Sequence, residues 1–208
     1  MRIEKLAAAP DRAGRYFVRF DDGQTLRLYR QTVEDFGLYA GMELEAEQFA
    51  ALQTAAGEMS AKMRAVRIVS ASNVSKKDLQ QRLVRKGEDP AQAQAAVKWM
   101  TDLDLLDDRK TAEQIVASCA RKGYGKMRAK QALYEKQIPK DLWDEVLADY
   151  PDQTEAISEY LQSHLTGKSD MREMKRAIDA LIRRGHSYGL IRRVLNELSF
   201  DTEELPEV

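Results

Sequence analysis

The sequence predicts a mostly α-helical protein of three tandem three-helix repeats, which form an elongated curved array behind a small N-terminal β-containing extension. Three observations support this fold class. Similar segments recur about fifty residues apart, a period typical of repeat architectures. From residue 75 onward, short amphipathic stretches carry helix-start and helix-stop residues at their ends. Residues 15–20 instead alternate between polar and apolar side chains, as strands do.

The repeats align through their apolar positions and through one recurring cation. A leucine anchors each copy, at Leu83, Leu133 and Leu181. Three positions later each copy has a cation, which is Lys86, Lys136 or Arg184. Stacked helical units of this kind present a surface to a larger partner rather than enclose a small substrate.

Composition describes a water-soluble, helix-rich chain. Of its 208 residues, 43% are hydrophobic and 32% charged, and the 5 prolines and 11 glycines are too few for a disordered or fibrous protein. No apolar run approaches the roughly 20 residues that cross a membrane, and residues 1–6 lack the apolar stretch of a secretory signal. The single cysteine, Cys119, excludes an internal disulfide framework and fits a reducing compartment. We therefore expect a cytoplasmic protein that does not contact membranes.

The net charge of −1 averages unlike regions. Residues 121–140 carry many Lys and Arg side chains and a single acid, Glu135, whereas residues 141–159 carry acids and no base. This alternation predicts a surface with separate basic and acidic zones, which suits a charged partner. The alternative for any one cluster is an ordinary solvated surface.

The N-terminal region is expected to form three strands, at residues 2–6, 15–20 and 25–29. Asp22-Gly23 is a strong hairpin signal between the last two. A short helix is predicted at 33–38 and a long one at 45–71, interrupted near Gly57. Because so small a sheet buries little by itself, we expect it to pack on the first helices of the repeats.

Capping residues predict the helices of the first repeat. Ser75 begins a helix that runs to Lys86, and Gly87 stops it. Asp89 and Pro90 begin the next, which continues to about residue 101.

The later repeats follow the same plan. Asp107 or Asp108 begins a helix that ends at Gly123, and helices at 126–136 and 140–149 complete the second repeat. The third repeat has helices at 152–165, 171–184 and 187–198, followed by an acidic tail from Asp201. The predicted divisions are an N-terminal extension with a β-hairpin at 1–57, helical repeats at 58–106 and 107–151, and a third repeat with the tail at 152–208.

No catalytic constellation is found, so the chain is not expected to be an enzyme. Cys119 shares an apolar helical stripe and is interpreted as a small core residue rather than a nucleophile. His164 and His186 lie beside helix ends without metal-ligand spacing, which favours surface or capping roles and predicts no metal and no cofactor. The segment 123–125 (Gly-Tyr-Gly) follows a helix rather than a strand, so it is a helix break rather than a nucleotide loop.

Nucleic-acid contact is the better supported chemistry. A group of cations surrounds the turn that leads into the helix at 126–136, where backbone amides also favour anions. A three-helix unit with a basic turn is similar in outline to a helix-turn-helix. Because base-reading side chains occupy no consistent register in the copies, we expect salt-sensitive backbone contact rather than sequence-specific readout.

The second repeat resembles the RecX family of bacterial recombinase regulators. The resemblance lies in Asp104-Leu-Leu-Asp-Asp108, Ala112, Arg121-Lys-Gly-Tyr-Gly-Lys126 and Arg128. The first and third repeats match as well, and the front segment resembles the β-containing extension of longer members. The departures are Thr111 in place of an aromatic residue, Met127 after Lys126, and Gln137 in place of a glycine.

This resemblance implies a modulator of RecA that acts in DNA repair, recombination and the SOS response. Family members are curved arrays of three-helix repeats that lie in the groove of the RecA–single-stranded DNA filament. They usually oppose filament growth, strand exchange and coprotease activity. The implied partners are the RecA filament and single- or double-stranded DNA, and the chain is expected to be a monomer. The alternative is a non-specific DNA-binding protein that acts independently of RecA; a hydrolase hidden in the array is remote.

The candidate contacts are chosen by the charge pattern. They are Arg121, Lys122, Lys126, Arg128, Lys130, Lys86 and Arg184. The family motif overlaps this set at Arg121, Lys122 and Arg128. For each single cation the alternative is a solvated helix face.

Overall fold

The fold is given by a computed structural model that describes residues 1–167 and 169–200. The predicted acidic tail from Asp201 lies outside the described residues. The chain divides into two compact units, Met1–Asp107 and Asp108–Val208. Each unit is described by itself below.

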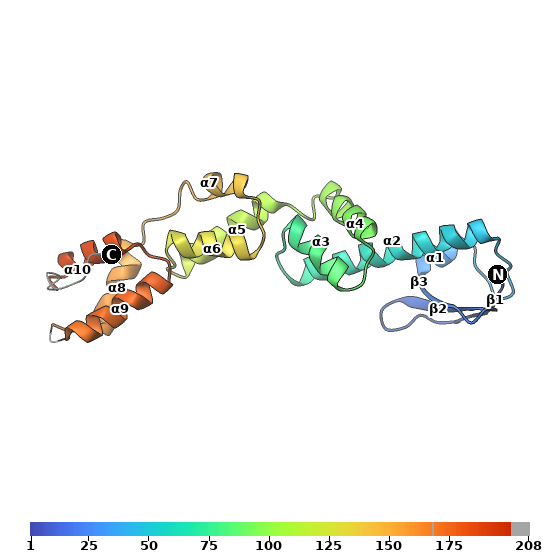
Figure 1. Cartoon of the computed structure of the whole chain (residues 1–208), viewed down its shortest axis with the longest axis horizontal. Helices are drawn as coiled ribbons and strands as arrows, with labels where there is room; N and C mark the ends of the chain where they lie inside the picture. Colours follow the sequence, from blue (N-terminus) through green and yellow to red (C-terminus); the bar gives the residue numbers. More distant parts are fainter. Residues whose placement is uncertain (168, 201–208) are drawn as a thin grey trace. The chain divides into compact units, whose positions relative to one another are not determined.

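The N-terminal unit opens with the three predicted strands, which form an antiparallel sheet in the order β1-β2-β3 (Figure 1). The strands are β1 (Ile3–Leu6), β2 (Arg15–Phe20) and β3 (Thr25–Tyr29). Val18 and Phe20 are buried on one face of β2, because successive side chains of a strand point to opposite faces. The turn between β2 and β3 places Gly23 at a φ of +84°, a conformation that glycine adopts without strain.

Two helices follow, α1 (Arg30–Asp35) and the long α2 (Ala46–Ala71). Phe49 and Leu52 of α2 close the core over the sheet, and the Phe49 ring meets that of Phe20 edge-on at a centroid distance of 5.0 Å. The expectation that the sheet packs on a helix leading into the repeats is confirmed.

The predicted interruption of the long helix near Gly57 is wrong, since α2 runs unbroken through that residue. A Cβ atom at Gly57 would collide with the side-chain amide of Gln92 in α4 (Pro90–Asp102). The glycine therefore serves the close approach of α4 to α2 rather than a break.

The first repeat consists of the second half of α2, α3 (Lys76–Arg85) and α4. Its predicted caps are confirmed. The Ser75 hydroxyl accepts a hydrogen bond from the Asp78 amide at 3.1 Å, and the Asp89 carboxylate accepts one from the Ala91 amide at 2.8 Å. The core of this repeat is centred on Leu79, Leu83 and Met100.

The second unit contains the other two repeats. The second repeat is built by α5 (Asp108–Arg121), α6 (Lys126–Glu135), the 3-10 turn η1 (Lys140–Leu142) and α7 (Trp143–Val146). The third is built by α8 (Thr154–His164), α9 (Met171–Arg183) and α10 (Tyr188–Glu197). Each repeat has its own buried apolar cluster.

The helix predicted at 140–149 is shorter than expected and ends at Val146. Acidic residues at its C-terminal end, among them Glu145 and Asp149, oppose the helix dipole there. Pro151 also disfavours helical backbone at the residue before it.

The threefold register is confirmed at the ends of the second helices. The anchors Leu83, Leu133 and Leu181 are all 0% exposed. The aligned cations Lys86, Lys136 and Arg184 are all helix C-caps. The residue after each cap is left-handed, with φ of +89° at Gly87, +54° at Gln137 and +88° at Gly185. In each copy the next amide bonds back to the anchor leucine's carbonyl, which completes a Schellman motif.

Within residues 1–167 and 169–200, no helix is both long enough and apolar enough to span a membrane.

Candidate interaction surface

A groove of about 660 Å³ in the second unit brings three of the predicted cations together with the acidic stretch that follows them in the sequence. Its cationic lining residues are Arg121, Lys122 and Arg184. Its acidic lining residues are Asp152, Glu155 and Glu159. We call this the mixed-charge groove. The sequence indicated separate basic and acidic zones, whereas the fold makes both line one hollow.

Local structure holds these side chains in place. Arg121 is the last residue of α5, and Arg184 caps α9 with its guanidinium over the Tyr160 ring, 4.7 Å from the centroid. Asp152 accepts hydrogen bonds from the side chain and backbone amide of Thr154, which lower the pKa of its carboxyl group. In the described part of the chain, no ion pair joins a cation of the groove to one of its acids. Charges of both signs therefore line the groove without neutralising one another through an ion pair.

Two backbone amides of the turn before α6, which the sequence suggested as favourable to anions, are already occupied within the protein. The Gly125 amide donates to the Arg184 carbonyl at 2.9 Å, and the Met127 amide donates to the Gly185 carbonyl at 3.2 Å. The carbonyls that end α9 thus satisfy amides that begin α6, with the two helix dipoles in favourable contact. The Gly125 and Met127 amides are therefore not available to a phosphate.

Two glycines permit this contact. A Cβ at Gly125 would collide with the Gly185 carbonyl, and a Cβ at Gly185 would collide with the Arg128 backbone. The Gly-Tyr-Gly segment therefore does more than break a helix, because Gly125 allows the backbones of two repeats to touch. Sequence reasoning missed this role, since it depends on Gly185, which lies in the next repeat.

His186 is buried, so of its two predicted roles the surface role is wrong, whereas its side chain bonds a carbonyl just beyond the end of α5, as a capping side chain does. It is only 5% exposed, and its Nε2 donates a hydrogen bond of 3.0 Å to the Gly123 carbonyl. Burial lowers the pKa of this imidazole, and the nearby Arg184 charge lowers it further. His164, by contrast, is exposed at the end of α8, as expected.

The remaining predicted contacts lie outside the mixed-charge groove. Lys126 and Arg128 are exposed in the first turn of α6, and Lys130 is half-buried one turn later. Arg128 also forms an ion pair with Glu135 at 3.6 Å. Lys86 belongs to the first compact unit. The interpretation of Cys119 as a core residue is confirmed, since it is buried and burial raises the pKa of its thiol.

Lys86 lines a second groove, of about 400 Å³, in the first unit. The other cations of this groove are Arg64, Arg67 and Arg82. We call it the cationic groove. Sequence reasoning missed these arginines because they come from the second half of α2 and from α3, where each could equally face solvent. Their only sequence signal is the spacing of Arg64 and Arg67, which places both on neighbouring faces of one helix.

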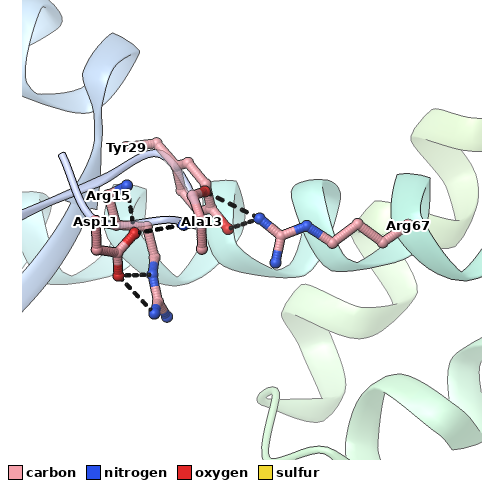
Figure 2. Close-up of polar contacts among 5 residues, drawn as sticks. All are labelled: Asp11, Ala13, Arg15, Tyr29 and Arg67. Atoms are coloured by element: carbon pink, nitrogen blue, oxygen red, sulfur yellow. Dashed lines mark hydrogen bonds and ion pairs between the residues drawn. The ribbon is translucent and has the colours of Figure 1, made fainter.

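Arg67 also ties the sheet to α2 (Figure 2). Its guanidinium donates to the Ala13 carbonyl at 3.0 Å and to the Tyr29 hydroxyl at 3.3 Å. The loop that carries Ala13 is braced by Arg15, whose side chain donates two hydrogen bonds to the Asp11 carboxylate. These bonds lower the pKa of Asp11 to about 2, so the brace persists across the neutral and mildly acidic range.

Three-helix repeats with charged grooves place this chain in the class of helical-repeat proteins. The family model described as RecX, second three-helix domain, matches residues 107–147. The regulatory protein RecX of Vibrio campbellii is 28% identical over 149 residues, which are 70% of this chain and 94% of that protein. The regulatory protein RecX of Clostridioides difficile is 26% identical over 211 residues and is matched over 98% of both chains.

Solved structures show the same fold. A crystal structure of regulatory protein RecX aligns with a TM-score of 0.65 at 21% identity, covering 94% of this chain and 98% of that one. The crystal structure of RecX from Lactobacillus salivarius aligns with a TM-score of 0.60 at 22% identity, covering 70% and 98%. The chain is thus similar to regulatory proteins of the RecX family along most of its length, and its second repeat matches that family's second three-helix domain.

Proposed function

We propose that the chain binds the RecA–single-stranded DNA filament and modulates it, most often by inhibiting recombinase and coprotease activity. The observation that carries this proposal is the match to the regulatory protein RecX of Clostridioides difficile over 98% of both chains. The fold is compatible with such a role, because repeats of helices with charged grooves suit a large charged partner.

The mixed-charge groove supports contact with protein rather than with nucleic acid alone. Its three acids would repel a bare phosphate backbone, while its three cations would attract acidic side chains. Exposed charges are screened beyond roughly 8 Å at physiological salt, so the two signs act on groups that come close. A protein surface with both basic and acidic side chains fits this pattern. Lys126 and Arg128, exposed at the start of α6, extend the proposed contact.

The test is the DNA-dependent ATPase activity of RecA. We expect the purified chain to lower ATP hydrolysis at substoichiometric ratios to RecA. No change at saturating chain would overturn the proposal. The paired variant Arg121→Gln/Lys122→Gln should weaken the effect, since it removes two cations of the groove. Lys175→Gln, which removes an exposed cation on α9 outside the groove, should not.

The same assay separates the proposal from DNA binding that is independent of RecA. A protein that merely sequesters single-stranded DNA loses its effect when the DNA is supplied in excess. A protein that binds the filament keeps its effect at constant RecA. Inhibition that disappears with excess DNA would therefore favour the independent DNA-binding function.

A further inference from the structure

The cationic groove of the first unit differs from the mixed-charge groove in the chemistry of its lining. Four cations line it, and the other lining residues are Ile68, Ala71 and Ser72. No acidic and no aromatic side chain belongs to its lining. Any ligand of this groove is therefore selected by negative charge and not by base stacking.

Two of the arginines form ion pairs with buried acids. Arg64 pairs with Glu88 at 2.6 Å, and Arg82 pairs with Asp78 at 2.8 Å. The carboxylates are buried, whereas the arginine side chains stay 36% and 31% exposed. The guanidinium groups are thus fixed in orientation while part of each faces the groove. Such pre-organisation lowers the entropy lost when a ligand is bound.

The other two cations are not neutralised by an acid. The bonds of Arg67 go to a carbonyl and a hydroxyl, both uncharged, and its side chain is exposed (Figure 2). Lys86 is exposed, and in the described residues its ammonium group forms no ion pair. With two buried acids set against four cations, the groove keeps an excess of two positive charges.

We propose that this groove binds the phosphodiester backbone of single-stranded nucleic acid. Planar guanidinium groups match phosphate oxygens with paired hydrogen bonds, and fixed guanidiniums do so with little loss of freedom. The absence of aromatic residues from the lining makes the contact independent of sequence. The proposal builds on the proposed function, because it assigns the DNA side of the filament contact to the first unit, but its test uses no RecA.

The experiment measures binding of the full chain to a fluorescent oligothymidylate across a series of salt concentrations. Each phosphate contact contributes about 0.7 to the slope of log affinity against log salt for a single strand. We expect Lys86→Gln and Arg67→Gln each to reduce the magnitude of that slope by about this amount. Lys136→Gln, at the equivalent helix C-cap of the second repeat, is the matched control and should leave the slope unchanged.

Arg64 and Arg82 are not substituted, because removing either would leave a buried carboxylate without its ion-pair partner and destabilise the fold. Arg67→Gln disturbs the loop at Ala13, so a thermal melt accompanies it. The Lys86 side chain holds no loop in place in this way, so the Lys86→Gln variant can decide the test by itself.

Four outcomes would overturn the proposal. One is a slope that Lys86→Gln leaves unchanged. Another is an equal loss in Lys136→Gln. The third is displacement of the oligothymidylate by polyglutamate at the same charge concentration. The fourth is dependence on Lys86 for duplex DNA only. A RecA assay with Lys86→Gln reports on the proposed function separately, because failure of the groove leaves filament contact through the second unit untouched.

Discussion

Burial of His186 couples one residue to the packing of two repeats. Its Nε2 donates to the Gly123 carbonyl, and its Nδ1 is buried and has no hydrogen-bond partner among the described residues. Protonation of Nδ1 would add a positive charge and a donor without an acceptor, close to the cation of Arg184. The neutral ring is therefore the form that the folded unit accommodates.

We predict that the second unit loses stability as the pH falls below about 7. The pKa of His186 is lowered in the folded state, so the unfolded chain takes up the proton first, near its ordinary value of about 6.5. The free energy of unfolding then declines from about pH 7 down to the folded-state pKa. Urea denaturation at successive pH values above about 5.5, where carboxylates remain ionised, measures this decline.

The only other histidine provides the control. His186→Gln should flatten the pH dependence, whatever its effect on stability at neutral pH. His164→Gln, at an exposed position, should retain it. A pH dependence that survives in His186→Gln would show that another group is responsible.

Charge and burial at single residues were predictable to different degrees. The cations Arg121, Lys122 and Arg184 could be selected from the sequence because charge is visible there. That acidic residues line the same groove could not be predicted, since Glu155 and Glu159 of α8 reach it only through the packing of that helix in the folded unit. The burial of His186 was missed because its bonding partner, Gly123, belongs to the preceding repeat.

At the scale of elements, the contact between the end of α9 and the start of α6 depends on Gly185. Gly87 occupies the equivalent position in the first repeat and has the same left-handed conformation, but a Cβ atom there would meet no atom within 4 Å. Substitutions at these two glycines can therefore distinguish the cost of left-handed backbone strain from the cost of disturbing a close backbone contact.

We predict that Gly185→Ala destabilises the protein clearly more than Gly87→Ala. Gly87→Ala should cost about 1–2 kcal/mol, because only the left-handed backbone is strained. Gly185→Ala carries the same strain and also forces the Arg128 backbone away, which adds about 1–3 kcal/mol or more. Chemical denaturation of both variants measures the difference. Equal losses would mean that the two helix ends are not held as closely as the structure indicates.

Most elements could be predicted because local signals place them. Ser75, Asp89 and Gly87 mark helix ends through their own backbone and capping chemistry, and the Asp-Gly turn marks the hairpin. The exceptions are set by distant contacts or by competing local signals. Gly57 is read locally as a break, yet α4 packs against it and the helix continues. The third helix of the second repeat is truncated by acids and a proline that the apolar pattern does not reveal.

For the whole molecule, the net charge of −1 hides a difference between the two compact units, whose grooves carry different sets of charged residues. The charged residues that line the groove of the first unit are all cations, whereas both signs of charge line the groove of the second unit. The repeats share their apolar anchors but not these charges. Copies of one helical plan can therefore differ in surface charge without any change of core.

The bonds between the second and third repeats also predict how the chain unfolds. Gly125 and Met127 donate to the end of α9, and His186 donates to Gly123, so neither repeat satisfies these groups alone. We expect a fragment of residues 108–208 to melt in one transition. A fragment of residues 152–208 should melt at least about 10 °C lower, since it loses three hydrogen bonds of about 1 kcal/mol each along with the packing around them. Circular dichroism of both fragments, with the other compact unit, residues 1–107, as a reference, provides the measurement. If the shorter fragment melts at the same temperature as the longer one, the contact between the repeats contributes nothing to stability and the third repeat folds by itself.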